Sequence, residues 1–105
     1  KQITGSDDLT PNEEQILVTY TVPALTKFRW LTGEGESDGE ARWTILIDDV
    51  EYLRRRNSFG DKNATLHIPL ELTAGQVLKV LGKNVTISGE TNSVIVWLYG
   101  KEMPA

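Results

Sequence analysis

Cysteine is absent from this 105-residue sequence, and histidine occurs once, at position 67. The lack of cysteine excludes disulfide bonds, thiolate metal sites and cysteine nucleophiles, so the fold depends on packing or assembly for its stability. The single His67 lies in a predicted strand, and no serine has the flanking pattern of a nucleophile elbow. We therefore expect no enzyme activity and no catalytic residue. A site assembled in space from His67 with Asp48 or Asp61 is the alternative left open.

Long apolar segments are also missing, as is an excess of positive charge. The longest uninterrupted apolar run, Val94–Tyr99, is far shorter than the ~20 residues that a membrane-spanning helix requires. Eleven Lys and Arg stand against fifteen Asp and Glu, which leaves a net charge of −4. Mild acidity of this kind opposes binding to a phosphate backbone. We expect neither a membrane nor a nucleic acid as partner.

The sequence does contain many short stretches in which apolar and polar residues alternate between turn-forming residues. Phe28 and Trp30 share one face of such a stretch. Trp43, Ile45 and Ile47 share one face of the next. A period of two is typical of half-buried strands, and no segment has a sustained helical period. About eight short strands, separated by turn signals roughly every 8–12 residues, predict an all-β antiparallel β-sandwich that is jelly-roll-like.

The beginning of the chain differs from the rest in composition. Residues 1–15 are mostly polar, with Ile3 and Leu9 as isolated apolar residues. We predict an extended N-terminal arm over 1–15, followed by a single β-sandwich domain over 16–105. Within the domain, Asp48-Asp49 predicts a tight hairpin turn, because Asp tolerates the positive φ that such turns require.

An acidic stretch, Glu34–Glu40, is similar to the start of a calcium-binding loop, since carboxylates alternate and a glycine follows. The closing bidentate glutamate of such a loop would fall at Ile45, which cannot bind a cation. We therefore predict a solvated loop, with no metal site and no cofactor. Two triplets beginning at Asn63 and Asn84 fit the N-glycosylation sequon, a pattern that often arises by chance.

Arg54, Arg55 and Arg56 are consecutive in a predicted strand. Alternation sends Arg54 and Arg56 to one face and Arg55 to the other. One interpretation is an edge strand whose charges block unwanted pairing and neutralise the nearby acidic stretch. The other is a partner-binding edge, because the planar guanidinium binds carboxylates bidentately.

The last predicted strand has an aromatic face. Trp97 and Tyr99 alternate with Val96 and Leu98, so one face of this strand is either covered by something else or exposed. We predict partner binding at Trp97 and Tyr99, most simply a contact between subunits. If enough aromatic residues lie on a solvent face, they could instead form a platform for stacking sugars.

Several short turn-rich segments between Val22 and Gly100 occur together in a known pattern. They are Val22-Pro23-Ala24, Ser37-Asp38-Gly39-Glu40, Ile45-Leu46-Ile47-Asp48-Asp49, Arg56-Asn57-Ser58 followed by Asn63, Ile68-Pro69-Leu70, Leu72-Thr73-Ala74-Gly75 and Leu98-Tyr99-Gly100. With these segments the chain resembles a family of small jelly-roll domains in tailed-bacteriophage virions, which act as capsid decoration (cement) proteins or fibre modules. The family pattern has glycine where this chain has Asp49.

The resemblance implies a non-enzymatic virion structural protein at the capsid surface, which binds the major capsid protein or another virion protein. It transfers no catalytic or ligand-binding residue. A small domain with an uncovered apolar face also gains stability from self-association, so we expect a homo-oligomer, either a trimer or a dimer. The alternative function is a carbohydrate-binding β-sandwich module of a phage fibre or of a glycan-active protein.

Overall fold

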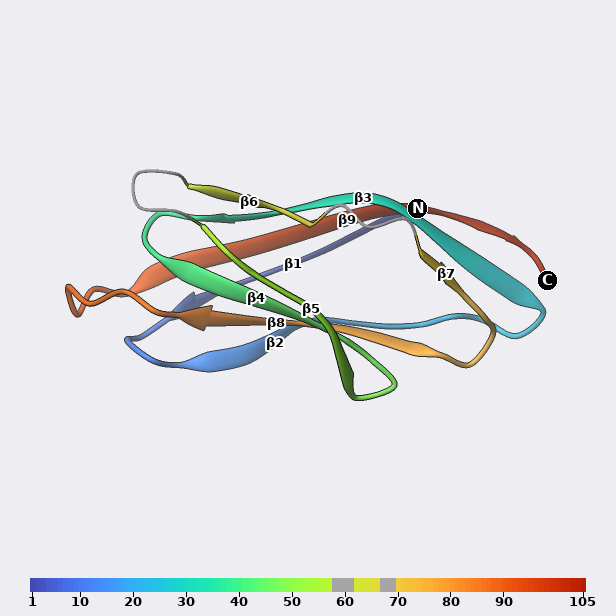
Figure 1. Ribbon diagram of the computed structural model, residues 1–105, viewed down its shortest axis with the longest axis horizontal. Coiled ribbons are helices and arrows are strands. Elements are labelled where there is room, and N and C mark those ends of the chain that lie inside the picture. The colour runs from blue at the N-terminus through green and yellow to red at the C-terminus, as the bar shows by residue number, and fades with distance from the viewer. Residues whose placement is uncertain (58–61, 67–69) are drawn as a thin grey trace.

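A computed structural model describes residues 1–57, 62–66 and 70–105, and these ranges contain strands and loops but no helix, hence none that could cross a membrane. The strands form two antiparallel sheets packed face to face, which confirms the predicted all-β sandwich (Figure 1). The strands are β1 (Gln2–Leu9), β2 (Glu14–Thr21), β3 (Thr26–Ser37), β4 (Ala41–Ile47), β5 (Val50–Arg56), β6 (Asn63–Thr65), β7 (Leu70–Leu72), β8 (Val77–Asn84) and β9 (Asn92–Pro104).

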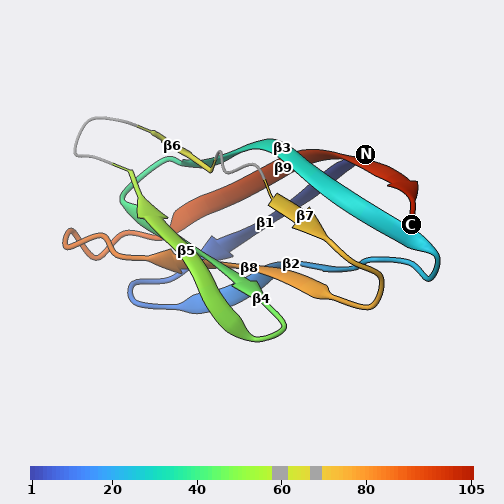
Figure 2. The ribbon, with the colours of Figure 1, turned by 45° about the vertical axis from the view of Figure 1, so that its right-hand side comes forward.

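The strand order is that of a jelly roll. One sheet has the order β1-β9-β3-β6, with β7 also paired to β3, and the other has the order β2-β8-β4-β5. The pairs are nested along the chain, since β1 pairs with β9, β2 with β8, β3 with β6 and β7, and β4 with β5. Such nesting arises when one long hairpin is folded over on itself. Figure 2 shows the two layers, with β3 and β9 above β4 and β8.

Alternate residues of each strand fill the space between the sheets. Trp30 and Trp43 are fully buried, as their phase in the sequence predicts. Both indole N–H groups are satisfied, because Trp30 Nε1 donates to the carbonyl oxygen of Thr32 at 3.0 Å and Trp43 Nε1 to that of Ile95 at 3.1 Å. The large aromatic rings therefore pack in the core without leaving a polar atom unpaired.

The N-terminal segment is not the predicted free arm. β1 pairs with β9 from Gln2 opposite Tyr99 to Leu9 opposite Asn92. Ile3 and Leu9 are buried in the core. Gly5 allows this, because a Cβ at that position would collide with the carbonyl oxygen of Leu17 in β2. The predicted division into an arm over 1–15 and a domain over 16–105 is therefore wrong at this edge, since 2–9 forms one strand of the sandwich and β2 begins at Glu14.

The loop in the acidic stretch is shorter than predicted, because β3 continues to Ser37. Gly33 and Gly35 face the core and leave room for large neighbours. A Cβ at Gly33 would collide with Leu98, and one at Gly35 with the indole of Trp43. These glycines therefore serve close packing within a strand. They do not end it.

The hairpin between β4 and β5 has the predicted geometry. Asp48 and Asp49 have φ values of 50° and 65°, the left-handed region that a two-residue hairpin turn of this type requires. Asp48 Oδ1 also accepts a hydrogen bond from the backbone N–H of Val77 at 2.9 Å, and Asp49 forms an ion pair with Lys79 at 2.8 Å. Two aspartates thus make this turn without a glycine.

Candidate functional site

The described residues contain no group of three or more His, Cys, Asp or Glu side chains that could hold a metal ion. His67 and Asp61 lie outside the described ranges, so the alternative catalytic site cannot be placed. Asp48, its third candidate member, takes part in the β4–β5 turn. In the acidic stretch, Asp38 Oδ1 accepts a hydrogen bond from the backbone N–H of Ser93 at 2.9 Å.

The first candidate surface is the outer face of the five-stranded sheet. Along β9, Val96 and Leu98 are fully buried, whereas the alternate residues point outward. Ile95 is 37% exposed, Tyr99 is 48% exposed, and Trp97 between them is half-buried. We call Ile95, Trp97 and Tyr99 the aromatic stripe. The prediction that one face of this strand is left uncovered within the chain is confirmed for the described residues.

Polar residues flank the aromatic stripe on both sides. On β3, Glu36 lies opposite Ile95 and Glu34 lies opposite Trp97. On β1, Thr4 lies opposite Trp97. An open depression of about 340 Å³ adjoins one end of the stripe. Its lining consists of Glu36, Ser37, Asp38, Lys62, Asn63, Ser93 and Ile95.

The other half of the same face is basic. Past Tyr99, Lys101 of β9 lies opposite Arg29 of β3, and Arg29 lies opposite Glu71 of β7. Glu71 forms ion pairs with Arg29 at 3.5 Å and with Lys27 at 3.4 Å. Lys101 forms no ion pair with any described residue. The face therefore changes from acidic to basic along the strands.

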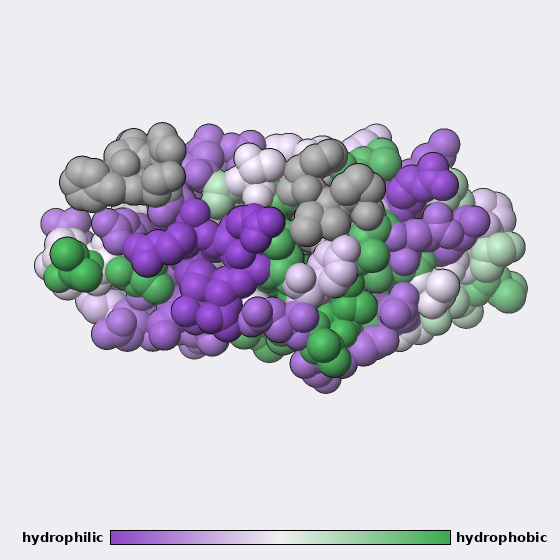
Figure 3. Space-filling view, viewed as in Figure 1, coloured by the Kyte–Doolittle hydropathy of each residue, from purple (hydrophilic) through white to green (hydrophobic). Residues whose placement is uncertain are grey.

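The second candidate surface carries the arginines of β5. Arg54 lies opposite Thr44 and Arg56 opposite Arg42, on the outer face of the four-stranded sheet. Arg55 lies opposite the buried Trp43 and so points to the other side of the strand, as predicted. In Figure 3, hydrophilic side chains gather over the C-terminal part of β5.

The arginines already have partners within the chain. Arg54 forms an ion pair with Glu51 at 2.7 Å, and Arg56 with Glu40 at 2.9 Å. Arg55 Nη1 donates to the carbonyl oxygen of Arg54 at 3.0 Å. The interpretation that this edge neutralises the acidic stretch is therefore confirmed for Arg56. Binding of an external partner by these arginines stays a prediction.

The five predicted partner-binding residues do not form one site. Trp97 and Tyr99 lie on the outer face of the five-stranded sheet, whereas Arg54 and Arg56 lie on the outer face of the four-stranded sheet. Because the sheets pack back to back, these two surfaces point in opposite directions. The predicted residues are therefore divided between two separate surfaces.

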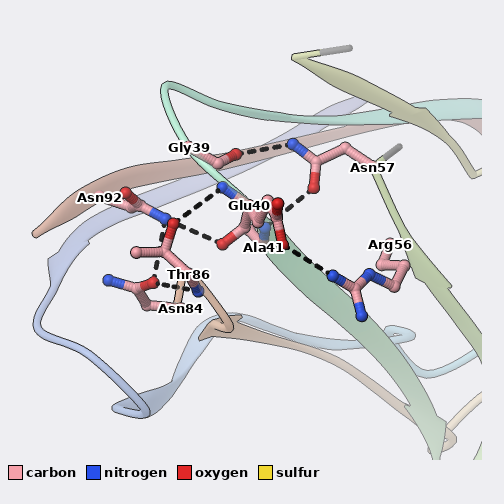
Figure 4. A network of polar contacts seen from close by, with 8 residues as sticks. All are labelled: Gly39, Glu40, Ala41, Arg56, Asn57, Asn84, Thr86 and Asn92. Atoms are coloured by element: carbon pink, nitrogen blue, oxygen red, sulfur yellow. Dashed lines mark hydrogen bonds and ion pairs between the residues drawn. The ribbon is translucent and has the colours of Figure 1, made fainter. Parts of the chain in front are cut away.

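Sequence reasoning missed a network of buried asparagines at one end of the sandwich (Figure 4). Asn84 Nδ2 donates to the carbonyl oxygens of Leu9 and Glu90, at 2.9 and 2.8 Å. Asn92 Nδ2 donates to the carbonyl oxygen of Glu40 at 2.8 Å and to Asn84 Oδ1 at 3.0 Å. Together they fasten three loops to one another. The sequon at Asn84 is therefore closed in the folded chain, because its amide group is fully buried and engaged.

Asn57 fastens the same end from the β5 side. Its Oδ1 accepts a hydrogen bond from the backbone N–H of Ala41 at 2.9 Å, and its Nδ2 donates to the carbonyl oxygen of Gly39 at 2.7 Å. The adjacent Arg56 binds Glu40, so this strand end is held by one neutral and one charged side chain. Single asparagines near turn-forming residues, at positions 57, 84 and 92, are the local sign of this network in the sequence.

A part-buried polar contact also joins the two sheets. Tyr20 of β2 donates its hydroxyl proton to Glu102 Oε1 of β9 at 2.8 Å. Burial of the phenol raises the pKa of Tyr20 above its ordinary value, and the hydrogen bond to the Glu102 carboxylate and its negative charge raise it further. The Tyr20 ring packs edge-on against Phe28, with ring centres 5.1 Å apart. The contact lies at the edge of the sandwich, where Glu102 also forms an ion pair with Lys1 at 3.6 Å.

Fold and surfaces together describe a β-sandwich with two outward faces of different character. No known protein family matches the sequence, and neither does any curated protein.

Proposed function

We propose that the protein is a non-enzymatic virion structural protein, a capsid decoration protein that binds a phage capsid at its outer surface and stabilises it. The observation that carries the proposal is the nested jelly-roll order of the strands, which agrees with the family that the sequence resembles. A ligand that binds only the assembled capsid stabilises it by mass action. The chain therefore needs a surface that fits the major capsid protein.

The outer face of the four-stranded sheet has the make-up of such a surface. Its middle row runs across the strands from Ile16, which is 54% exposed, through Leu81 and Thr44 to Arg54. Charged residues lie in the rows on either side. Ile16 and Leu81 thus form a small apolar patch with charged residues beside it, and protein interfaces combine apolar patches with a polar rim.

The ion pairs on this face do not prevent binding to a partner. Both Arg54 and Glu51 are about half exposed, and an exposed pair of this kind is worth only about 0–1 kcal/mol. An acidic patch on the capsid protein can therefore share or replace the internal carboxylates at little cost. Arginine is suited to this exchange because its guanidinium binds carboxylates bidentately.

Sedimentation with undecorated capsids of the encoding phage tests the proposal. The wild-type chain is expected to sediment with the capsids, and Arg54→Glu to weaken this binding at least about tenfold. Arg55→Glu is the matched control. Arg55 is next to Arg54 in the sequence but points to the other side of β5, so its substitution should leave binding unchanged. If the wild-type chain stays in the supernatant, the proposal fails. If both variants bind capsids alike, the capsid-binding surface lies elsewhere on the molecule.

A second candidate function is carbohydrate binding, which the aromatic stripe favours. Trp97 and Tyr99 offer ring faces for stacking, Glu34 offers a carboxylate, and Thr4 a hydroxyl on the same face. A glycan array is the direct test. Retention of the wild-type chain that is lost in Trp97→Ala, together with no sedimentation on capsids, would replace the decoration hypothesis by this one.

A further inference from the structure

The outer face of the five-stranded sheet is divided into two oppositely charged halves. Glu34 and Glu36 lie on one side of the row formed by Tyr99 and Thr32, and neither forms an ion pair among the described residues. Three cations and one carboxylate lie on the other side. They are Lys27, Arg29, Lys101 and Glu71.

The division is regular along the strands. The row of Trp97 and Glu34 lies two residues of β9 before Tyr99, and the row of Lys101 and Arg29 lies two residues after it. Four residues of β9 before Tyr99 is the row of Ile95 and Glu36. Four residues after it is the row of Met103 and Lys27. Tyr99 thus marks the midpoint between matching acidic and basic rows.

We propose that two copies of the chain pair through this face, about a two-fold axis that runs across the strands at the row of Tyr99. Such an axis lays β9 on the partner's β9 and β3 on the partner's β3, with the strand direction reversed. The acidic half of each copy then meets the basic half of the other. This proposal does not depend on capsid binding, which uses the opposite face.

The two rows on either side of the Tyr99 row find suitable neighbours in this arrangement. Glu34 meets the partner's Arg29, and Glu36 meets the partner's Lys27. The indole of Trp97 meets the partner's Lys101, an arrangement that allows a cation–π contact. The apolar Ile95 meets the partner's Met103, which is half-buried within the single chain. Because each contact occurs twice about the axis, the interface is closed and gives a dimer without further growth.

The size of the face sets the expected strength. Nine residues of β9 span about 26 Å, and β9, β3 and the edge formed beside β3 by β6 and β7 give a width of about 15 Å. This projected area, roughly 400 Å² on each copy, is at the low end for specific interfaces. We therefore expect a weak dimer with a dissociation constant of about tens of micromolar. Since its ion pairs lie near solvent, the dimer should dissociate as salt is raised.

Charge exchange between two variants tests the pairing. In Glu34→Lys/Glu36→Lys both halves of the face are basic, and in Lys27→Glu/Arg29→Glu both are acidic. By sedimentation equilibrium at low salt, each variant alone is expected to be monomeric where the wild type is dimeric. An equimolar mixture of the two is expected to form a heterodimer at least as tight as the wild-type dimer. Circular dichroism of each variant checks that its fold is intact.

The matched control for Glu34→Lys/Glu36→Lys is Glu14→Lys/Glu51→Lys. It makes the same change of net charge on the opposite face and should leave the dimer unchanged. Cross-linking gives a measurement free of charge changes. The chain has no cysteine, so Tyr99→Cys places a single thiol near the axis, and a short bis-maleimide should link two copies. Tyr52→Cys, which is exposed to a similar degree on β5, should remain unlinked.

Three outcomes would overturn the proposal. A wild-type chain that stays monomeric at several hundred micromolar excludes the dimer, and binding of a glycan through Trp97 would then assign the face to a sugar. Failure of the mixed variants to associate excludes this two-fold axis. A dimer unaffected by both charge variants places the contact on another surface. Each of these outcomes leaves the capsid-binding test above unaffected.

Discussion

At the scale of single residues, Tyr20 links the acid–base chemistry of the chain to its packing. Its ordinary pKa is 10.0, and burial with the hydrogen bond to Glu102 holds it higher in the folded chain. At pH values between 10.0 and the higher pKa of the folded chain, Tyr20 keeps its proton in the folded state and has lost it in the unfolded state. Folding stability therefore is fully present below about pH 10 and falls as the pH rises above it.

The Tyr20→Phe variant isolates this effect. Above about pH 10, the free energy of unfolding of the wild type should fall more steeply than that of Tyr20→Phe, by at most about 1.4 kcal/mol per pH unit. Urea unfolding between pH 8 and pH 11 measures both slopes. Because other groups titrate equally in both proteins, parallel curves would show that Tyr20 ionises freely in the folded state.

Gly35 gives a prediction about space in the core. Gly35→Ala should destabilise the chain by about 1–3 kcal/mol, because the new methyl group collides with the Trp43 indole. Trp43→Phe, with its smaller ring, should make the same change at position 35 less costly, and a double-mutant cycle of unfolding free energies measures this coupling. The control is Asn63→Ala at an exposed position. Strictly additive effects would contradict the packing argument.

Residues whose neighbours in sequence define their environment were predictable. Trp30 and Trp43 are in phase with apolar residues two positions away, and Asp48-Asp49 carries its own turn chemistry. Gly33 was not predictable, because glycine is a turn former in isolation and its role depends on Leu98, which is distant in the sequence. Nor did anything local show that Asn84 binds Leu9.

At the scale of elements, β1 is the strand that sequence reasoning misjudged. Only Ile3, Gly5 and Leu9 follow the period of two with small or apolar residues, and Asp7 interrupts it. Its outer positions are polar because they face solvent, and an edge strand of this kind needs apolar residues only on the face that packs against the core. The partner that makes it a strand, β9, lies almost the whole chain away. A long-range pairing of this kind has no local signal.

Deletion of residues 1–9 tests the role of β1. The shortened chain should be unfolded or less stable by more than about 3 kcal/mol, because the core loses Ile3 and Leu9 and one side of β9 loses its partner. Leu9→Ala alone should cost about 2–5 kcal/mol. Asp8→Ala, at an exposed position of the same strand, is the control. Thermal unfolding monitored by circular dichroism measures these effects. A shortened chain with the melting temperature of the full chain would contradict the prediction.

At the scale of the whole molecule, we expect stability to be independent of calcium. Glu34 and Glu36 lie on an outer strand face, and Asp38 is used by Ser93, so the acidic stretch does not form the loop that calcium requires. The melting temperature should be the same in EDTA and in millimolar calcium. A rise of the melting temperature by several degrees with calcium would contradict this and would show that carboxylates come together into a calcium site.

The nesting of the strands also determines when the fold can form during synthesis. β9 lies between β1 and β3 in the five-stranded sheet, yet it is the last of the described sandwich strands to be translated. Until it leaves the ribosome, β1 has no partner in its sheet, and one long edge of β3 is open. Folding is therefore delayed until β9 has been synthesised and is slow, as expected of topologies dominated by distant pairings. During that interval the nascent chain exposes unpaired strands, and it is then that a chaperone or a second nascent copy would find it.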